Sequence, residues 1–245
     1  EGISLIGMDA DEEALERAEK RLHMFGDRVS LMKGNFGNLK NNLSALGFTA
    51  VDGIIFDLGF STYQMMGKRG FSFSDDGAVD MRMDRSQSLT AYDVVNGYCF
   101  EDLKRVIGDF GEENRATQIA RAILEARKKR PVDSGRELAG VVETVKRRTG
   151  KIHPATKVFQ ALRMEVNDEL GNLQRGLSEA IEILRPSGRA LVISFHSLED
   201  RVVKTMFRQS PDVTVVHKKA VRPSRDEVRR NPRARSAKLR VAEKI

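Results

Sequence analysis

Four short apolar runs along the chain each lead to a polar or aromatic residue. Because ligands in open parallel sheets bind outside the carboxyl ends of the strands, this pattern predicts a ligand site at one rim of a sheet. The runs are residues 3–8 before Asp9, residues 29–32 before Asn35 and Phe36, residues 53–56 before Asp57, and residues 190–195 before His196.

The segment between the first two runs has the spacing of an amphipathic helix. Ala14, Leu15, Ala18 and Leu22 fall on one face of residues 11–22, and carboxylates occupy the first turn. Strand, helix and strand in this order predict a parallel crossover and an α/β fold.

The middle of the chain loses the strand-like pattern. Helical spacing appears in residues 100–110, 116–128 and 137–148, after which Pro154 is well placed in the first turn of a further helix. Another helix, residues 173–184, is expected to stop at Pro186, Ser187 and Gly188 before the last strand. We therefore divide the chain into a first core part (1–86), a helical insertion (87–152) and a second core part (153–245).

The composition predicts a soluble, enzyme-sized protein. The chain has 245 residues, of which 40% are hydrophobic and 31% charged, and no apolar run approaches the roughly 20 residues needed to span a bilayer. One cysteine, Cys99, excludes an internal disulfide and a thiolate metal cluster, so we expect no metal and a cytoplasmic location.

The net charge of +7 is concentrated in a basic tail, residues 217–245. Eleven Lys and Arg face three Asp and Glu there, and Pro223 and Pro232 argue against a single regular helix. The tail is either a solvated surface segment or a phosphate-contacting one, and such crowding of like charges favours phosphate. The candidate RNA contacts in it are Arg229, Arg230, Arg233 and Arg235.

A series of segments closely resembles the MraW/RsmH family of ribosomal RNA methyltransferases. The resemblance covers nearly the whole chain in the family's order. The segments read DLGFS from Asp57, RGFSF from Arg69, DMRMD from Asp80, HPAT from His153, FQALR from Phe159, NDEL from Asn167, SFHSLEDR from Ser194 and RSAKLR from Arg235.

This resemblance implies a Rossmann-like methyltransferase core interrupted by a helical domain. It also implies methyl transfer from S-adenosylmethionine to the exocyclic N4 of a cytidine in small-subunit ribosomal RNA. By motif position, Asp9 resembles the carboxylate that binds the ribose hydroxyls and Phe36 the side chain beside the adenine, while Asp57 and Gln64 resemble further cofactor contacts.

The residues themselves support part of this assignment. A carboxylate such as Asp9 can accept both hydrogen bonds of a vicinal diol, and the competing role of helix cap is better filled by Asp11. Asp57, with the carbonyls after it, could hold and orient the cytosine amine as the catalytic group, or could serve the cofactor alone. The target base must also leave its stack to reach the site.

Two departures from the family pattern weaken the comparison. Thr62-Tyr63-Gln64 stands where the family usually reads Ser-Pro-Gln, which makes the position of Gln64 less secure. The chain also starts at Glu1, just before what resembles the second strand, so we expect the first strand and its Gly-rich loop to be missing and cofactor binding to be impaired.

Other candidate substrate contacts each have a plainer interpretation. Asp80, Arg82 and Asp84 contact RNA or close the pocket, or they form an ordinary ion-pair group. His196 either contacts substrate or merely closes a strand before a helix capped by Ser197 with Asp200.

Two rival functions follow from the same residues. A non-catalytic RNA-binding or ribosome-assembly factor could keep this fold, and the missing Gly-rich loop supports it. A nicotinamide dehydrogenase could place an acidic residue after its second strand, but it does not explain the basic tail. We expect small-subunit ribosomal RNA as the partner and no membrane, with a homodimer left open.

Overall fold

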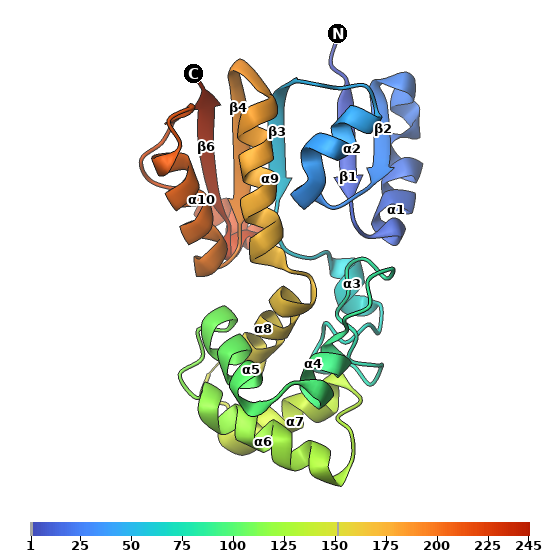
Figure 1. Cartoon of the computed structure of the whole chain (residues 1–245), viewed down its shortest axis with the longest axis vertical. Coiled ribbons are helices and arrows are strands. Elements are labelled where there is room, and N and C mark those ends of the chain that lie inside the picture. The colour runs from blue at the N-terminus through green and yellow to red at the C-terminus, as the bar shows by residue number, and fades with distance from the viewer. Residues whose placement is uncertain (1, 151) are drawn as a thin grey trace. The chain divides into compact units, whose positions relative to one another are not determined.

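The computed structural model describes residues 2–150 and 152–245 and divides them into two compact units (Figure 1). The first unit comprises Gly2–Gly59 and Leu170–Ile245, and the second comprises Phe60–Glu169. The second unit therefore includes residues 60–86 and 153–169 in addition to most of the segment outlined above as the helical insertion. Glu1, the first residue, and Lys151, which lies within the expected insertion, are outside the described residues.

The first unit contains two sheets. A parallel pair has the order β1-β2, and a mixed four-stranded sheet has the order β3-β4-β6-β5, in which β3 and β4 are parallel and β6 is antiparallel to β4 and β5. This arrangement confirms the predicted α/β class. The strands are β1 (Leu5–Asp9), β2 (Val29–Lys33), β3 (Val51–Asp57), β4 (Leu184–Ser194), β5 (Val213–Val215) and β6 (Lys238–Lys244).

Helices of the first unit cover these strands, and their apolar stripes form its core. Leu43 of α2, Leu177 of α9 and Phe207 of α10 are buried against Phe56 of β3 and Val192 of β4. The helical segments are α1 (Glu12–Leu22), η1 (His23–Arg28), η2 (Phe36–Asn38), α2 (Leu39–Ala45), α9 (Glu169–Ile183), α10 (Ser197–Gln209), α11 (Arg225–Arg230) and η4 (Pro232–Ser236).

The crossover from β1 to β2 forms as predicted. Asp11 caps α1, and its side chain accepts a hydrogen bond from the Glu13 amide at 3.1 Å. Glu12 and Glu13 lie in the first turn and Lys20 and Arg21 in the last, so the charges complement the helix dipole at both ends. The parallel pairing then places Asp9 opposite Lys33.

The expected break before the last core strand is wrong. Strand β4 already begins at Leu184 and includes Pro186, Ser187 and Gly188, with a register shift opposite residues 51–53 of β3. Ser187 has a φ of +64°, and a Cβ at Gly188 would lie 2.9 Å from the Asp52 carbonyl oxygen. The Pro-Ser-Gly sequence is thus a bulge that β3 approaches closely, rather than a separate loop.

The prediction that the basic tail is not a single helix is confirmed. The tail also contributes a core strand, β6, which was not predicted. Strand β6 lies between β4 and β5, and its Ala242 is fully buried. Lys238 and Arg240 of β6 both bind Asp200 of α10, at 3.0 and 2.7 Å. Part of the charge in the tail is therefore neutralised within the unit.

The second unit is helical, as expected for the middle of the chain. Its largest core cluster joins Leu103 of α5, Ile119 and Ile123 of α6, Leu138 of α7 and Leu162 of α8. The elements are α3 (Thr62–Met66), α4 (Ala91–Gly97), α5 (Phe100–Arg105), a π-helical turn η3 (Val106–Phe110), α6 (Ala116–Lys129), α7 (Gly135–Val145) and α8 (Thr156–Val166).

A long loop between α3 and α4 is fixed to α8 by polar contacts. The Asn167 amide donates to the Met81 carbonyl at 2.8 Å and its oxygen accepts from the Met83 amide at 2.7 Å. Met81 is fully buried although its φ is +60°, which is unfavourable for a non-glycine residue. Across residues 2–150 and 152–245, no helix is both long and apolar enough to cross a membrane.

Candidate cofactor and substrate site

Asp9 lies at the carboxyl end of β1 and keeps access to solvent. One carboxylate oxygen accepts a hydrogen bond from the Asp11 amide at 2.8 Å. Partial burial raises the pKa of the Asp9 carboxyl, and the backbone hydrogen bond from Asp11 only partly opposes this shift. Because Asp11 caps α1 and Asp9 is exposed, the second carboxylate oxygen of Asp9 can accept a hydrogen bond from a hydroxyl.

Phe36 follows β2 and packs on the core of the first unit. Its ring meets the Phe56 ring of β3 edge to face, with centroids 5.6 Å apart. The preceding residue, Asn35, holds the turn because its side chain accepts from the Gly37 amide at 2.8 Å. Gly176 of α9 allows the close approach, since a Cβ there would lie 2.6 Å from the Phe36 carbonyl oxygen.

Asp57 closes β3 with a carboxylate that no described residue engages by a hydrogen bond or ion pair. Desolvation raises its pKa, because the local chain excludes water without supplying a cation or a donor. The residue remains exposed on one side. The end of β3 therefore carries an exposed hydrogen-bond acceptor that is available to a ligand.

The adjacent strand ends beside Asp57. The register pairs Asp57 with Ile193, and the Leu58 amide donates to the Ile193 carbonyl at 3.0 Å. A Cβ at Gly59, whose φ is +99°, would lie 3.4 Å from the Phe195 ring. Glycine thus permits a backbone turn after Asp57 that lies against the ring of Phe195, the residue that follows β4.

Gln64 belongs to the second unit and is buried there. Its side-chain oxygen accepts from the Ser61 amide at 2.7 Å, and the Ser61 hydroxyl accepts from the Gln64 amide at 3.3 Å. These bonds form a capping box at the start of α3. The capping contact fixes the side chain even without the proline of the family motif; its cofactor role stays a prediction.

The expected cap of α10 is wrong in its residues. His196, rather than Ser197, is the N-cap: its Nδ1 accepts from the Glu199 amide at 3.3 Å. Its Nε2 lies 3.1 Å from a Glu199 carboxylate oxygen, and the other oxygen accepts from the Phe195 amide at 2.8 Å. Nδ1 of His196 thus caps α10, and Nε2 is buried beside the Glu199 carboxylate without a hydrogen bond from the described residues. A contact of His196 with substrate stays a prediction.

Asp80 and Arg82 form a two-pronged ion pair in the loop before α4. The guanidinium donates to both Asp80 oxygens, at 2.7 and 2.9 Å, and to the carbonyls of Arg85 and Gln87. Burial would raise the pKa of the Asp80 carboxyl, but the hydrogen bonds from Arg82 outweigh it and lower the pKa. Asp84 instead accepts from Ser86. The pair fixes the loop, and an RNA contact by it stays a prediction.

The tail arginines are exposed in different settings. Arg229 lies 3.5 Å from Asp226 within α11, and Arg230 donates to the Asp226 carbonyl. Arg233 and Arg235 lie in η4, which leads directly into β6. All four side chains face solvent, as a phosphate contact requires.

Comparison with known proteins decides the family. The model of the family described as "MraW methylase family" matches residues 1–245. The chain belongs to the MraW methylase family.

Several curated relatives of this MraW chain carry the name Ribosomal RNA small subunit methyltransferase H. The protein from Persephonella marina is 47% identical, over 98% of this chain and 84% of the relative. That from Pseudothermotoga lettingae is 49% identical, over 99% of this chain and 85% of the relative. The protein from Sulfurihydrogenibium sp. is 46% identical, over 99% of this chain and 85% of the relative.

In the first unit of this MraW chain, two of the predicted site residues, Phe36 and Asp57, are linked through a contact that the sequence did not predict. The Phe36–Phe56 ring pair links the end of β2 to β3, the strand that ends on Asp57. A second missed feature is the bond of Asp200 to Lys238 and Arg240. Opposite charges in the SFHSLEDR and RSAKLR segments were the available signal for it.

Proposed function

We propose that this chain transfers a methyl group from S-adenosylmethionine to the exocyclic N4 of a cytidine in small-subunit ribosomal RNA. The observation that carries the proposal is the 46–49% identity, over at least 98% of the chain, to proteins named Ribosomal RNA small subunit methyltransferase H. The relatives' name does not specify the cofactor or the cytidine N4 atom. These two parts of the proposal rest on the motif resemblance and on the chemistry of the rim.

The residues of the first unit fit S-adenosylmethionine in kind. Asp9 offers a carboxylate to the ribose hydroxyls, and Phe36 offers a ring edge beside the adenine. Asp57 is a carboxylate without a hydrogen-bonding partner among the described residues. An acceptor with no partner within the described residues and with a pKa raised by partial desolvation is available to a donor on a ligand, which supports a binding role. Gln64 is the cofactor contact proposed from the second unit.

When bound, S-adenosylmethionine supplies a methyl group already activated by the positive sulfur. The protein must therefore align the methyl with the nucleophile and exclude water. In the proposed reaction the bond from cytidine N4 to the methyl carbon would form as the carbon–sulfur bond breaks with its electron pair remaining on sulfur. The proton lost from N4 would pass to an acceptor beside it, for which Asp57 is the candidate, or to water. The difficult partner is N4, because its lone pair is delocalised into the ring.

Asp57 is suited to assist N4. A carboxylate oxygen can accept a hydrogen bond from the amine, hold the N–H away from the methyl group and so direct the lone pair toward it. Its raised pKa makes it a stronger proton acceptor than an ordinary aspartate once it is ionised. If Asp57 instead binds only the cofactor, its loss would weaken S-adenosylmethionine binding rather than turnover at saturation.

The substrate residues are proposed to act at two levels. Arg229, Arg230, Arg233 and Arg235 provide exposed cations for phosphates. Asp80 and Arg82 hold the loop that follows α3, and His196 holds the first turn of α10 beside Phe195. These last three residues would thus act on RNA through the position of the backbone around them.

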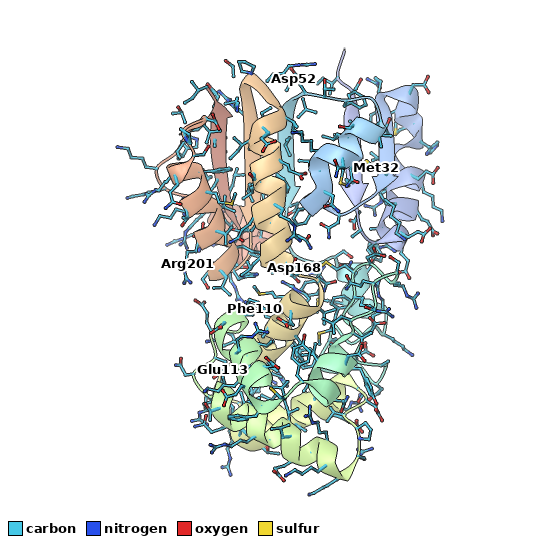
Figure 2. All side chains as sticks on the ribbon, viewed as in Figure 1. Met32, Asp52, Phe110, Glu113, Asp168 and Arg201 are labelled. Atoms are coloured by element: carbon cyan, nitrogen blue, oxygen red, sulfur yellow. The ribbon has the colours of Figure 1, made fainter. Side chains whose placement is uncertain are left out.

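The first test measures methyl transfer to small ribosomal subunits, with the modified nucleoside identified by mass spectrometry. We expect N4-methylcytidine from the unaltered chain and at least a hundredfold slower turnover from Asp57→Ala, the scale of loss found when a transition-state hydrogen-bonding group is removed. Asp52→Ala is the matched control, because Asp52 is an exposed carboxylate at the opposite end of the same strand, paired with Arg185 (Figure 2).

The second test measures binding of S-adenosylmethionine by calorimetry. Saturable binding that Asp9→Ala abolishes would support the cofactor site. A folded chain that binds small-subunit RNA but neither binds S-adenosylmethionine nor transfers a methyl group would refute the proposal and favour a non-catalytic RNA-binding factor.

A further inference from the structure

Helix α10 has two chemically different faces. Val203 and Phe207 are buried in the core of the first unit, whereas Arg201, Lys204 and Arg208 are exposed on the other side. The three cations stand at positions i, i+3 and i+7, so they share one face and span about 10 Å at 1.5 Å per residue. Figure 2 labels Arg201 in the early part of this helix.

The two acidic residues of α10, Glu199 and Asp200, have partners other than Lys204 and Arg208. Glu199 is buried and accepts from the Phe195 and His196 amides. Asp200 is bound to Lys238 and Arg240, and the hydrogen bonds from these two cations overcome the effect of burial and lower its pKa. No described residue makes an ion pair with Lys204 or Arg208. An ordinary solvated helix face would mix both signs of charge.

The row continues into the basic tail. Because Asp200 binds Lys238 and Arg240, the first turn of α10 is held against the start of β6, and Figure 1 shows the two elements side by side. The turn η4 ends two residues before β6 and carries Arg233 and Arg235, both exposed. The pairing through Asp200 thus joins two groups of cations that lie some 30 residues apart in sequence.

We propose that the outer face of α10 is a contact surface for the phosphodiester backbone of RNA. The surface comprises Arg201, Lys204 and Arg208, continued by Arg233 and Arg235. Lys204 and Arg208 are exposed cations without an ion pair among the described residues. Such cations suit a polyanion, because each Lys or Arg that neutralises a phosphate releases a counterion from the nucleic acid. Contacts of this kind orient the RNA and do not read its sequence. The choice of RNA as the polyanion rests on the proposed function.

The experiment compares two double charge reversals of the full chain. Lys204→Glu with Arg208→Glu alters the α10 surface, while Lys20→Glu with Arg21→Glu makes the same change of net charge on the exposed last turn of α1. Binding of a fluorescently labelled hairpin from small-subunit ribosomal RNA is followed by anisotropy between 50 and 200 mM salt. Circular dichroism establishes that both variants are folded.

We expect the α10 variant to bind the hairpin at least tenfold more weakly than the α1 variant. Neutralising the same two residues, Lys204→Ala with Arg208→Ala, should lower the slope of log affinity against log salt by about 1.5, because each phosphate contact contributes roughly 0.7–0.9. Equal affinities and slopes for the α10 and α1 variants would refute the surface. A second result would also refute the surface as an RNA contact: the unaltered chain binds vesicles containing phosphatidylserine, and the α10 variant loses vesicle binding but keeps its affinity for RNA.

Methyl transfer separates this proposal from the proposed function. If both hold, the α10 variant raises KM for RNA and leaves kcat at saturating RNA unchanged. The unaltered chain could instead bind the hairpin in a salt-dependent way, lose this binding in the α10 variant, and show no methyl transfer. That result would refute the proposed function and support the surface. Methyl transfer with an unaltered KM in the α10 variant would refute the surface alone.

Discussion

The ring of Phe36 meets the ring of Phe56 edge to face, with an interplanar angle of 83° and centroids 5.6 Å apart. Phe36 follows a strand of the two-stranded sheet, and Phe56 lies in a strand of the four-stranded sheet. The contact therefore ties together two sheets that share no backbone hydrogen-bond ladder among the described residues. It also sets the position of the ring proposed to lie beside the adenine.

Replacing either ring should separate packing from cofactor binding. We expect Phe36→Leu and Phe56→Leu each to lower the free energy of unfolding by about 1 kcal/mol, the usual worth of an aromatic pair beyond its buried area. Phe36→Leu alone should also weaken S-adenosylmethionine binding, because Phe56 is buried and Phe36 is partly exposed. Urea unfolding and calorimetry measure the two quantities. Equal losses of cofactor affinity would contradict a direct role for Phe36.

Gly176 should be intolerant of a side chain although it lies within a helix. A Cβ there would lie 2.6 Å from the Phe36 carbonyl oxygen and 2.9 Å from its ring, so Gly176→Ala must displace α9 or Phe36. We expect a loss of about 1–3 kcal/mol in the free energy of unfolding, as for overpacked cores.

The matched control for Gly176 is Gly140 in α7. An added Cβ at Gly140 meets nothing within 4 Å, and the residue is exposed. Gly140→Ala should therefore stabilise the chain by up to about 1 kcal/mol through helix propensity. A neutral Gly176→Ala in the same urea series would show that the close approach of α9 to Phe36 is not needed.

Much of the rim could be predicted from local sequence because its signals are local. A strand that ends on Asp9 or Asp57 presents that residue wherever the strand pairs, and Asp11 caps α1 through its immediate neighbours. By contrast, β6 is hidden in a strongly charged segment. Its cations are compatible with a core strand only because Asp200, about 40 residues away in sequence, binds two of them.

Other features depended on non-local contacts or on unusual residue types. Histidine is not among the preferred N-cap residues, so the local signal favoured Ser197 over His196. The bulge in β4 at Pro186–Gly188 reflects how closely β3 approaches, which no helix-stop signal encodes. The order of strands and the Phe36–Phe56 pair likewise require the three-dimensional arrangement.

Asp57 should lower stability at neutral pH. Its pKa is raised in the folded state, so the folded chain binds more protons than the unfolded chain, and stability falls as the pH rises from the unfolded pKa of about 3.9 through the folded value. Asp57→Asn removes this penalty. We expect the variant to be more stable than the unaltered chain at pH 7 and to lose that advantage below about pH 3.9.

Urea unfolding at several pH values measures the stability effect, and methyl transfer is assayed on the same samples. The expected result is a more stable and inactive protein, as for a residue whose desolvation serves binding or catalysis. A less stable Asp57→Asn at pH 7 would show that the carboxylate has a stabilising partner and would argue against its role as a ligand acceptor.

Asp200 should show the opposite dependence on pH. Burial would raise its pKa, but the hydrogen bonds from Arg240 and Lys238 outweigh burial and lower it. The resulting stabilisation is present above the unfolded pKa of about 3.9 and is lost as the pH falls through the lower folded value. Asp200→Asn should therefore cost about 2 kcal/mol at neutral pH, the scale of a hydrogen bond to a charged group.

The variant also tests how the α10 surface is built. Without the carboxylate, the ion pairs that link the first turn of α10 to Lys238 and Arg240 of β6 are lost. Charge alone would then strengthen RNA binding, because the variant is more positive by one unit, whereas loss of the alignment between α10 and η4 would weaken it. A weaker affinity for the hairpin at pH 7, in conditions where the variant is fully folded, would show that the geometry of the surface outweighs its net charge.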